Sequence, residues 1–186
     1  MDGTKRKRQA RLIRISRKVH RYTGLALALF FFIVGVTGLL LGWKKQAVLL
    51  PPTAKGASAL AAQWLPVDSL TKKAHTYLQQ SVPENLSLDL DRIDIRPDKG
   101  IAKFVYANHY WEVQVDCTNA SLLSVGQRHS DFLEHLHDFS LFDRELKTSG
   151  DYIKLFYTTI MGLSVIIFTL TGFWLWYGPK QMKGSR

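Results

Sequence analysis

Two long uncharged segments dominate the pattern of apolar and polar positions along this chain of 186 residues. Residues 22–43 and 155–178 contain no charged side chain. Each segment exceeds the roughly 20 apolar residues that are needed to cross a hydrocarbon core about 30 Å thick. The pattern therefore predicts two transmembrane helices, at 22–43 and 155–178.

Between these helices, in residues 44–154, apolar and polar residues alternate over short distances, as in a folded domain. Residues 44–65 contain Pro51-Pro52 and several small residues, which is typical of a linker. A helix follows, with one apolar face, and then short alternating runs predict strands. The residues that carry these signals are Leu70, Ala74, Tyr77 and Leu78 for the helix, and Leu86, Leu88, Leu90, Ile93, Ile95, Trp111, Val113, Val115 and Leu122 to Val125 for the strands.

The alternation of apolar positions changes parity between Leu90 and Ile93, which indicates a bulge. We therefore expect a small domain at 66–128, with one helix on an antiparallel sheet of three or four strands. A juxtamembrane helix from about Ser130 to Leu141 and a break at 148–150 complete a connecting region at 129–154. The predicted fold is an α+β membrane protein in which two antiparallel transmembrane helices flank this exported domain.

The net charge of +10 is concentrated in the two tails. Residues 1–21 hold nine Lys or Arg and one Asp, residues 44–154 are nearly neutral, and residues 179–186 add three basic residues. By the positive-inside rule, both termini are expected to be cytoplasmic and residues 44–154 are expected to lie outside. Basic tails beside membrane helices contact anionic lipid. A nucleic-acid partner is therefore not expected.

A cleaved signal peptide is the competing interpretation of the first apolar segment, and Ala57-Ser58-Ala59 has the small residues of a cleavage site. However, the apolar core of a signal peptide is about 7–15 residues long, whereas this segment has 22 uncharged residues. A permanent anchor therefore fits better. The single cysteine, Cys117, has no intrachain partner for a disulfide.

Small residues form one stripe on each predicted membrane helix, and such stripes let helix backbones approach closely. We expect the two helices to pack along these stripes, or to pair with the same stripes of a second copy. Close approach to a flat cofactor is the alternative. The positions assigned to packing are Gly24, Gly35, Gly38 and Gly42 on the first helix, and Gly162, Thr169 and Gly172 on the second.

One histidine, His20, lies on the small-residue stripe of the first helix. An ionisable residue inside a helix bundle is a functional candidate, and neutral imidazole is a common axial ligand of haem iron. His75 and His129 are interpreted as solvated residues and His109 as a turn residue. In the juxtamembrane helix, His135 and His137 flank the apolar stripe on opposite sides. The exported region has no Gly-rich phosphate loop, HExxH motif or Cys-x-x-Cys pair.

Several short motifs resemble those of the PepSY-associated transmembrane family, across residues 17–180. They are Val19-His20-Arg21-Tyr22-Thr23-Gly24, Val36-Thr37-Gly38, Trp111 to Asp116, Leu136-His137 and Leu170 to Trp176. Asn119-Ala120 departs from the resemblance, because the family usually has a glycine in that turn. Larger four-helix members include ferric-siderophore reductases with bis-histidine haem. The resemblance therefore implies a PepSY-like domain at 66–128 and haem b held by His20 and His137.

The chain has only two membrane helices, with His20 expected on the cytoplasmic side and His137 outside. A bilayer about 30 Å thick would separate them, whereas two axial nitrogens on one iron lie ~4 Å apart. One chain cannot supply both ligands of one haem. Bis-histidine ligation therefore requires a homodimer or a partner membrane subunit.

Two functions remain open from the sequence. The first is b-haem electron transfer linked to iron uptake, with the chain as a possible subunit of a ferric reductase. The second is a non-catalytic accessory or regulatory protein that binds a partner through its PepSY-like domain. Trp174, Trp176 and Tyr177 fit an interfacial aromatic belt in either case.

Overall fold

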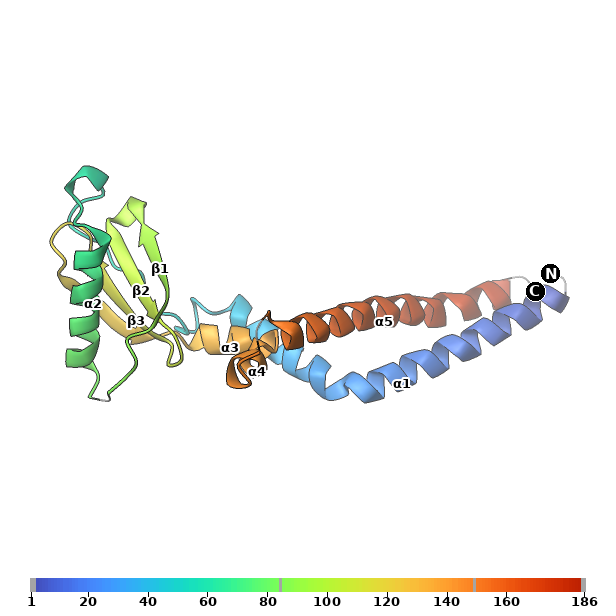
Figure 1. Ribbon diagram of the computed structural model, residues 1–186. Helices are drawn as coiled ribbons and strands as arrows, with labels where there is room; N and C mark the ends of the chain where they lie inside the picture. The colour runs from blue at the N-terminus through green and yellow to red at the C-terminus, as the bar shows by residue number, and fades with distance from the viewer. Residues whose placement is uncertain (1–2, 84, 149, 185–186) are drawn as a thin grey trace. The chain divides into compact units, whose positions relative to one another are not determined.

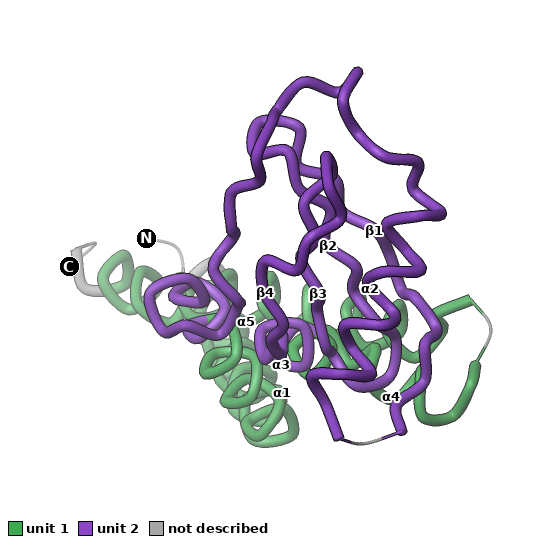
Figure 2. Tube along the Cα trace, turned by 90° about the vertical axis from the view of Figure 1, so that its left-hand side faces the viewer, with its two compact units in different colours: residues 1–38, 135–186 green, residues 39–134 purple. Residues whose placement is uncertain are grey.

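The structure, a computed structural model, describes residues 3–83, 85–148 and 150–184. The chain divides into two compact units (Figure 2), one built from residues 1–38 and 135–186 and the other from residues 39–134. The first unit is helical and the second combines a helix with a sheet. Each unit is described by itself below.

Two long antiparallel helices form most of the helical unit (Figure 1): α1 (Gly3–Gly42) and α5 (Tyr152–Gly184). Both are long and apolar enough to cross a membrane, over Arg6–Gly42 and Tyr152–Met182. Helix α1 begins well before the uncharged segment and includes the basic region. Lys and Arg favour helices and neither Gly nor Pro occurs at 4–23, so nothing in that stretch ends the helix.

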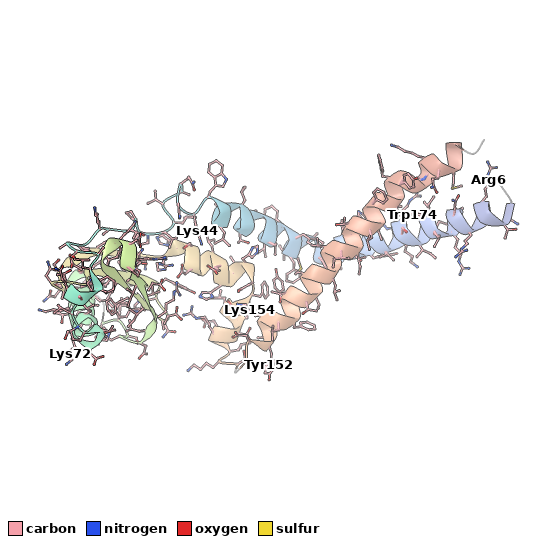
Figure 3. All side chains as sticks on the ribbon, turned by 90° about the horizontal axis from the view of Figure 1, so that it is seen from above. Arg6, Lys44, Lys72, Tyr152, Lys154 and Trp174 are labelled. Atoms are coloured by element: carbon pink, nitrogen blue, oxygen red, sulfur yellow. The ribbon has the colours of Figure 1, made fainter. Side chains whose placement is uncertain are left out.

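Asp143 caps the beginning of α5. Its Oδ2 accepts a hydrogen bond from the backbone N–H of Lys154 (2.7 Å), and its Oδ1 accepts one from Ile153 (3.1 Å). These bonds satisfy two of the N–H groups that a helix start leaves without an intrahelical partner. Figure 3 labels Tyr152 and Lys154 at this end of α5. The expected break at 148–150 includes Ser149, which lies outside the described residues.

The predicted helix at 130–141 is in fact two helices, α3 (His129–His137) and α4 (Ser140–Glu145). The chain turns at Phe139, whose φ of 64° lies in the left-handed region. The Asp138 side chain stabilises the turn by accepting a hydrogen bond from the backbone N–H of Ser140 (3.0 Å). The Phe139 ring stacks on Tyr157 of α5, with centroids 4.1 Å apart. The helix signal was correct, but apolar periodicity does not reveal a turn of this kind.

The second unit contains α2 (Val67–Ser81) and four strands: β1 (Leu90–Arg96), β2 (Ile101–Tyr106), β3 (Trp111–Asp116) and β4 (Leu122–Gln127). The strands form one antiparallel sheet in the order β1-β2-β3-β4. Two short 3₁₀ turns, Ala61–Gln63 and Pro97–Lys99, join the elements. The predicted α+β class, with two long apolar helices flanking a helix and an antiparallel sheet, is confirmed.

The core of this unit lies between α2 and one face of the sheet. Leu70, Ala74 and Leu78 of α2 pack there against apolar side chains of β2 and β3, namely Ala102, Phe104, Tyr106, Val113 and Val115. A fully buried large apolar side chain contributes about 1.5–3 kcal/mol. Strand pairing shifts register between Leu90 and Arg92, so the predicted bulge is confirmed. Leu86 and Leu88 pack against the core but precede the strand.

The other face of the sheet is polar, and residues 50–58 run across it. Gln114 of β3 fixes this segment by accepting a bond from Ala54 N–H and donating one to Pro52 O, both at 2.9 Å. Asp116 accepts another from Ala57 N–H (2.6 Å). Burial would raise the pKa of Asp116, but hydrogen bonds from backbone N–H groups outweigh burial and hold that pKa below its usual value. Part of the expected linker is therefore bound to the sheet.

Candidate functional site: two histidine–threonine pairs

The first pair joins the N-terminal part of α1 to the C-terminal part of α5. His20 Nδ1 lies 2.9 Å from Oγ1 of Thr171. The ring is half-buried and covers Gly172, where an added Cβ would lie 3.5 Å from His20 Cε1. Two residues that follow one another on α5 therefore hold the ring of one residue on α1.

The second pair has the same construction at the other end of the two long helices. His137, the last residue of α3, has its Nδ1 2.8 Å from Oγ1 of Thr37 on α1. A Cβ added at Gly38 would lie 3.4 Å from His137 Cε1. Each histidine therefore rests on a Thr-Gly dipeptide, and the relationship is reciprocal: one histidine belongs to α1, and α1 supplies the dipeptide for the other.

We assign the proton of each histidine from the hydrogen bonds of its threonine hydroxyl. Thr171 Oγ1 donates to the backbone oxygen of Ile167 (2.7 Å), and Thr37 Oγ1 donates to that of Ile33 (2.6 Å). A hydroxyl has one proton, so an oxygen that donates to its own helix meets the histidine as an acceptor. Nδ1 then carries the proton, and the lone pair of the neutral ring lies on Nε2. Metal-bound histidines are commonly oriented in this way by a hydrogen bond from the other ring nitrogen.

An aromatic contact further restricts His20. The ring of Phe168 lies 3.8 Å from the His20 ring, centroid to centroid. Room for Phe168 depends on Gly24, because an added Cβ at that position would come within 2.7 Å of its Cζ. The side chain that packs at Gly24 is thus the Phe168 ring, which lies against His20.

The two pairs lie far apart along the membrane helices. Thr37 follows His20 by 17 residues on one continuous helix, which corresponds to about 26 Å at 1.5 Å per residue. Two axial nitrogens on one iron lie ~4 Å apart. The structure therefore does not bring His20 and His137 together, as the distance argument from the sequence also required.

The other residues assigned to packing lie in open positions. A Cβ added at Gly35, Gly42 or Gly162 would meet no heavy atom of the described chain within 4 Å. Thr169 is exposed, and its hydroxyl bonds to Val165 O of its own helix (2.8 Å). Within one chain, the stripes are therefore only partly covered. Their proposed role in pairing with a second copy stays a prediction.

The remaining histidines have structural partners or lie at the surface. His135 Nδ1 is 2.7 Å from Ser140 Oγ, and His109 Nε2 is 2.9 Å from Ser87 O. The His75 ring lies beside Tyr106, and His129 is exposed. Among the described residues, no three His, Cys, Asp or Glu side chains gather to hold a metal ion.

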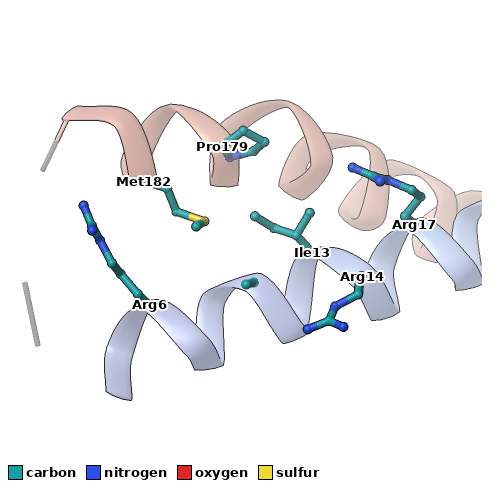
Figure 4. Close-up of a pocket in the computed structure, with 7 residues that line it drawn as sticks. Arg6, Ile13, Arg14, Arg17, Pro179 and Met182 are labelled. Carbon is teal, nitrogen blue, oxygen red and sulfur yellow. The ribbon is translucent and has the colours of Figure 1, made fainter. Parts of the chain in front are cut away.

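A cleft of about 760 Å³ separates α1 and α5 near the chain ends (Figure 4). Arg6, Arg14 and Arg17 line it together with apolar side chains that include Ile13 and Met182. No acidic residue lies among the lining residues. Guanidinium groups beside an apolar surface suit the phosphate and acyl chain of an anionic lipid.

Sequence reasoning identified both histidines but assigned no role to Thr37, Thr171 or Phe168. The two threonines were visible as Thr-Gly dipeptides within the motifs. Their spacing from the histidines, 151 residues for His20–Thr171 and 100 for Thr37–His137, leaves no local pattern that links them. Only the antiparallel arrangement of the helices reveals the pairing.

Comparison with protein families gave a match to the PepSY-associated TM region over residues 17–185. Comparisons with curated proteins and with solved structures gave no match. The matched range includes α1 from residue 17 onward, all of α5, the sheet and both histidine–threonine pairs. The chain therefore belongs to the PepSY-associated transmembrane family and is a membrane protein.

Proposed function

We propose that this protein is a b-haem electron-transfer protein of the bacterial inner membrane, linked to the reduction of ferric complexes during iron uptake. His20 and His137 are the proposed axial ligands. The observation that carries the proposal is the pair of Thr-Gly dipeptides, each of which holds a histidine by Nδ1 and leaves the lone pair on Nε2. That tautomer is the form of imidazole that binds iron through Nε2.

The residues around each histidine fit a haem ligand better than a structural histidine. Among the described residues, each ring has one hydrogen bond, which engages Nδ1 only. Gly38 and Gly172 provide flat surfaces beneath the rings. When bound, a b-type haem supplies reversible one-electron chemistry.

The separation of the two histidines supports two distinct positions rather than one. With both termini cytoplasmic and residues 44–154 outside, His20 lies near the cytoplasmic surface and His137 near the outer one. Each position then needs a second imidazole, which a second copy of the chain provides if the copies are related by a twofold axis along the membrane normal. Gly35, Gly42 and Gly162 offer open surfaces for such a copy.

Absorption spectroscopy of the purified full chain tests the proposal. Protein from haem-sufficient cells should show the reduced-minus-oxidised bands of b-haem. The His20→Ala and His137→Ala variants should each lose about half of the signal, because each removes one of two separate positions. The matched controls are His75→Ala and His109→Ala in the second unit, which should retain the full signal.

A folded but colourless protein would overturn the proposal. It would favour the alternative function, in which a non-catalytic accessory protein binds a partner through residues 66–128. Equal loss of signal in the control variants would show that the bands do not come from ligation by His20 and His137. The proposal also requires a second imidazole at each position, from a dimer or from another subunit. Light scattering in detergent measures whether the protein forms such a complex.

A further inference from the structure

A second cleft, of about 690 Å³, lies on the sheet face opposite α2. One wall comes from the segment that crosses this face, including Pro51, Pro52 and Thr53, and the other from β1, β2 and the turn between them. Gln114 fixes the crossing segment through its bonds to Pro52 and Ala54. The cleft is therefore a built feature of the second unit and not a gap beside a free linker.

Positive charge prevails among the residues that line this cleft. Lys45, Arg96, Lys99, Lys103 and Arg128 contribute five cations, whereas Asp94 and Asp98 contribute two carboxylates. The net charge of the lining is thus +3. The carboxylates of Glu112 and Asp131, which pair with Lys103 and Arg128, reduce the net charge of the whole cluster to +1. Asp94 also pairs with Arg92, at 3.5 Å.

Lys103 is a buried cation at the cleft, with only 5% of its surface exposed. Its Nζ lies 3.4 Å from Oε1 of Glu112, which is long for a charge-assisted hydrogen bond. The same oxygen accepts a shorter bond from Gln114 (2.7 Å), and Arg128 pairs with the other oxygen. Glu112 is thus shared among three donors and only partly balances Lys103.

The cations around Lys103 also act on its pKa. Burial lowers the pKa of Lys103, Glu112 raises it, and the nearby cations Arg128 and Arg96 lower it again. Lys45, Arg96 and Lys99 form no ion pair with any residue in the described ranges. Cations that converge on a recessed surface raise the local concentration of anions.

We propose that this cleft binds a small molecule or headgroup that carries at least two carboxylate or phosphate groups. Arg96 and Lys99 bind it at the rim, and Lys103 is the buried cation toward which one anionic group is directed. The planar guanidinium of Arg96 suits two-point recognition of such a group. This site goes beyond the proposed electron transfer and does not depend on haem.

An evenly solvated charged surface is the plain alternative. Such a surface keeps its lysines exposed, because a buried ammonium loses hydration. Lys103 is instead held beneath a fixed wall, with its one carboxylate shared. An anion in the cleft would compensate that cost, which an open charged surface does not incur.

Calorimetric titration of the full chain in phosphatidylcholine nanodiscs tests the proposal, with citrate and pyrophosphate as probes. Wild-type protein should bind at least one of them with a saturable isotherm at moderate salt. The Arg96→Gln and Lys99→Gln variants, which remove charges from the rim, should each weaken binding about tenfold. The matched control removes two cations from exposed positions of α2, Lys72→Gln with Lys73→Gln, and should leave binding unchanged.

The same titration in nanodiscs that contain phosphatidylglycerol distinguishes two sources of the anion. Citrate binding that is lost there assigns the cleft to an anionic lipid headgroup, and binding that persists assigns it to a soluble anion. Absence of saturable binding of both probes in phosphatidylcholine nanodiscs would overturn the proposal. Equal weakening by the α2 control would also overturn it, because binding would then follow overall charge.

Discussion

His20 Nδ1 and Thr171 Oγ1 lie 2.9 Å apart, although 151 residues separate them in the chain. The threonine uses its only proton on its own helix, so its oxygen accepts a hydrogen bond from the Nδ1–H group of His20. A residue with a role in helix geometry thereby also selects a histidine tautomer. The same reasoning applies to Thr37 and His137.

Replacing Thr171 by Val should weaken the preference of His20 for one tautomer. Valine has nearly the same shape but accepts no hydrogen bond, so the preference of His20 for a proton on Nδ1 should fall by about two- to tenfold, the equivalent of one ordinary hydrogen bond. Nitrogen-15 NMR of histidine-labelled, haem-free protein measures the two tautomers directly. Thr171→Ser keeps the hydroxyl and should behave like wild type. A Val variant with unchanged tautomers would refute the assignment.

Gly24 should tolerate alanine less well than Gly35 does. The added methyl at Gly24 meets the Phe168 ring at 2.7 Å, whereas the one at Gly35 meets open space. Overpacking of this kind costs about 1–3 kcal/mol, so Gly24→Ala should lower the melting temperature in detergent. Gly35→Ala, the matched control, should leave it within error in the monomer. Equal melting temperatures for both variants would show that Phe168 moves aside freely.

Glu112 should be the most sensitive position on the polar face of the sheet. Its fully buried carboxylate balances Lys103 and Arg128 at once. Glu112→Gln leaves Lys103 without a carboxylate and Arg128 with Asp131 alone, and it should destabilise the protein by about 3 kcal/mol, as for other broken buried pairs. Lys103→Met should cost clearly less, because Glu112 keeps Arg128 and Gln114. Urea unfolding followed by tryptophan fluorescence compares them, and the reverse order would contradict this account.

Asp116 should make the second unit sensitive to acid. Its pKa is held below the ordinary value near 3.9, so its carboxylate adds stability that is complete at neutral pH and is lost as pH falls below about 4. Thermal unfolding by circular dichroism at pH 7, 5, 4 and 3 measures this loss. Asp116→Asn should be less stable at pH 7 and should show a smaller decline toward pH 3. If stability declined equally with pH in both proteins, the Asp116 carboxylate would be excluded as a source of the acid sensitivity.

The elements that were predicted from the sequence follow from local patterns. The uncharged segments, the α2 face and the bulge after Leu90 each depend on residues that are neighbours in the chain. The turn at Phe139 is different, because it depends on stacking with Tyr157 and on the side chain of Asp138. Likewise, Asn119-Ala120 stands in the turn where the resemblance leads us to expect a glycine, and the φ of Ala120, 57°, lies in the left-handed region.

The residues of the candidate site were likewise only partly predictable from the sequence. His20 was recognisable from its place on the small-residue stripe, and His137 from the Leu136-His137 motif of the family resemblance. Their threonine partners were not, since a Thr in an apolar helix ordinarily bonds to its own backbone, and both threonines also do so. The charged cleft was hidden for a further reason: residues 50–58 have the composition of a linker, and only contacts with Gln114 and Asp116 place them on the sheet.

The reciprocal use of Thr-Gly dipeptides also imposes an order on biogenesis. Thr37 and His137 are both synthesised before α5, whereas His20 waits for Thr171, within the last helix. The pair of Thr37 and His137 is thus complete in the growing chain while the pair of His20 and Thr171 is not. A chain cut short before Thr171 would retain both members of the first pair and leave His20 without its hydroxyl partner.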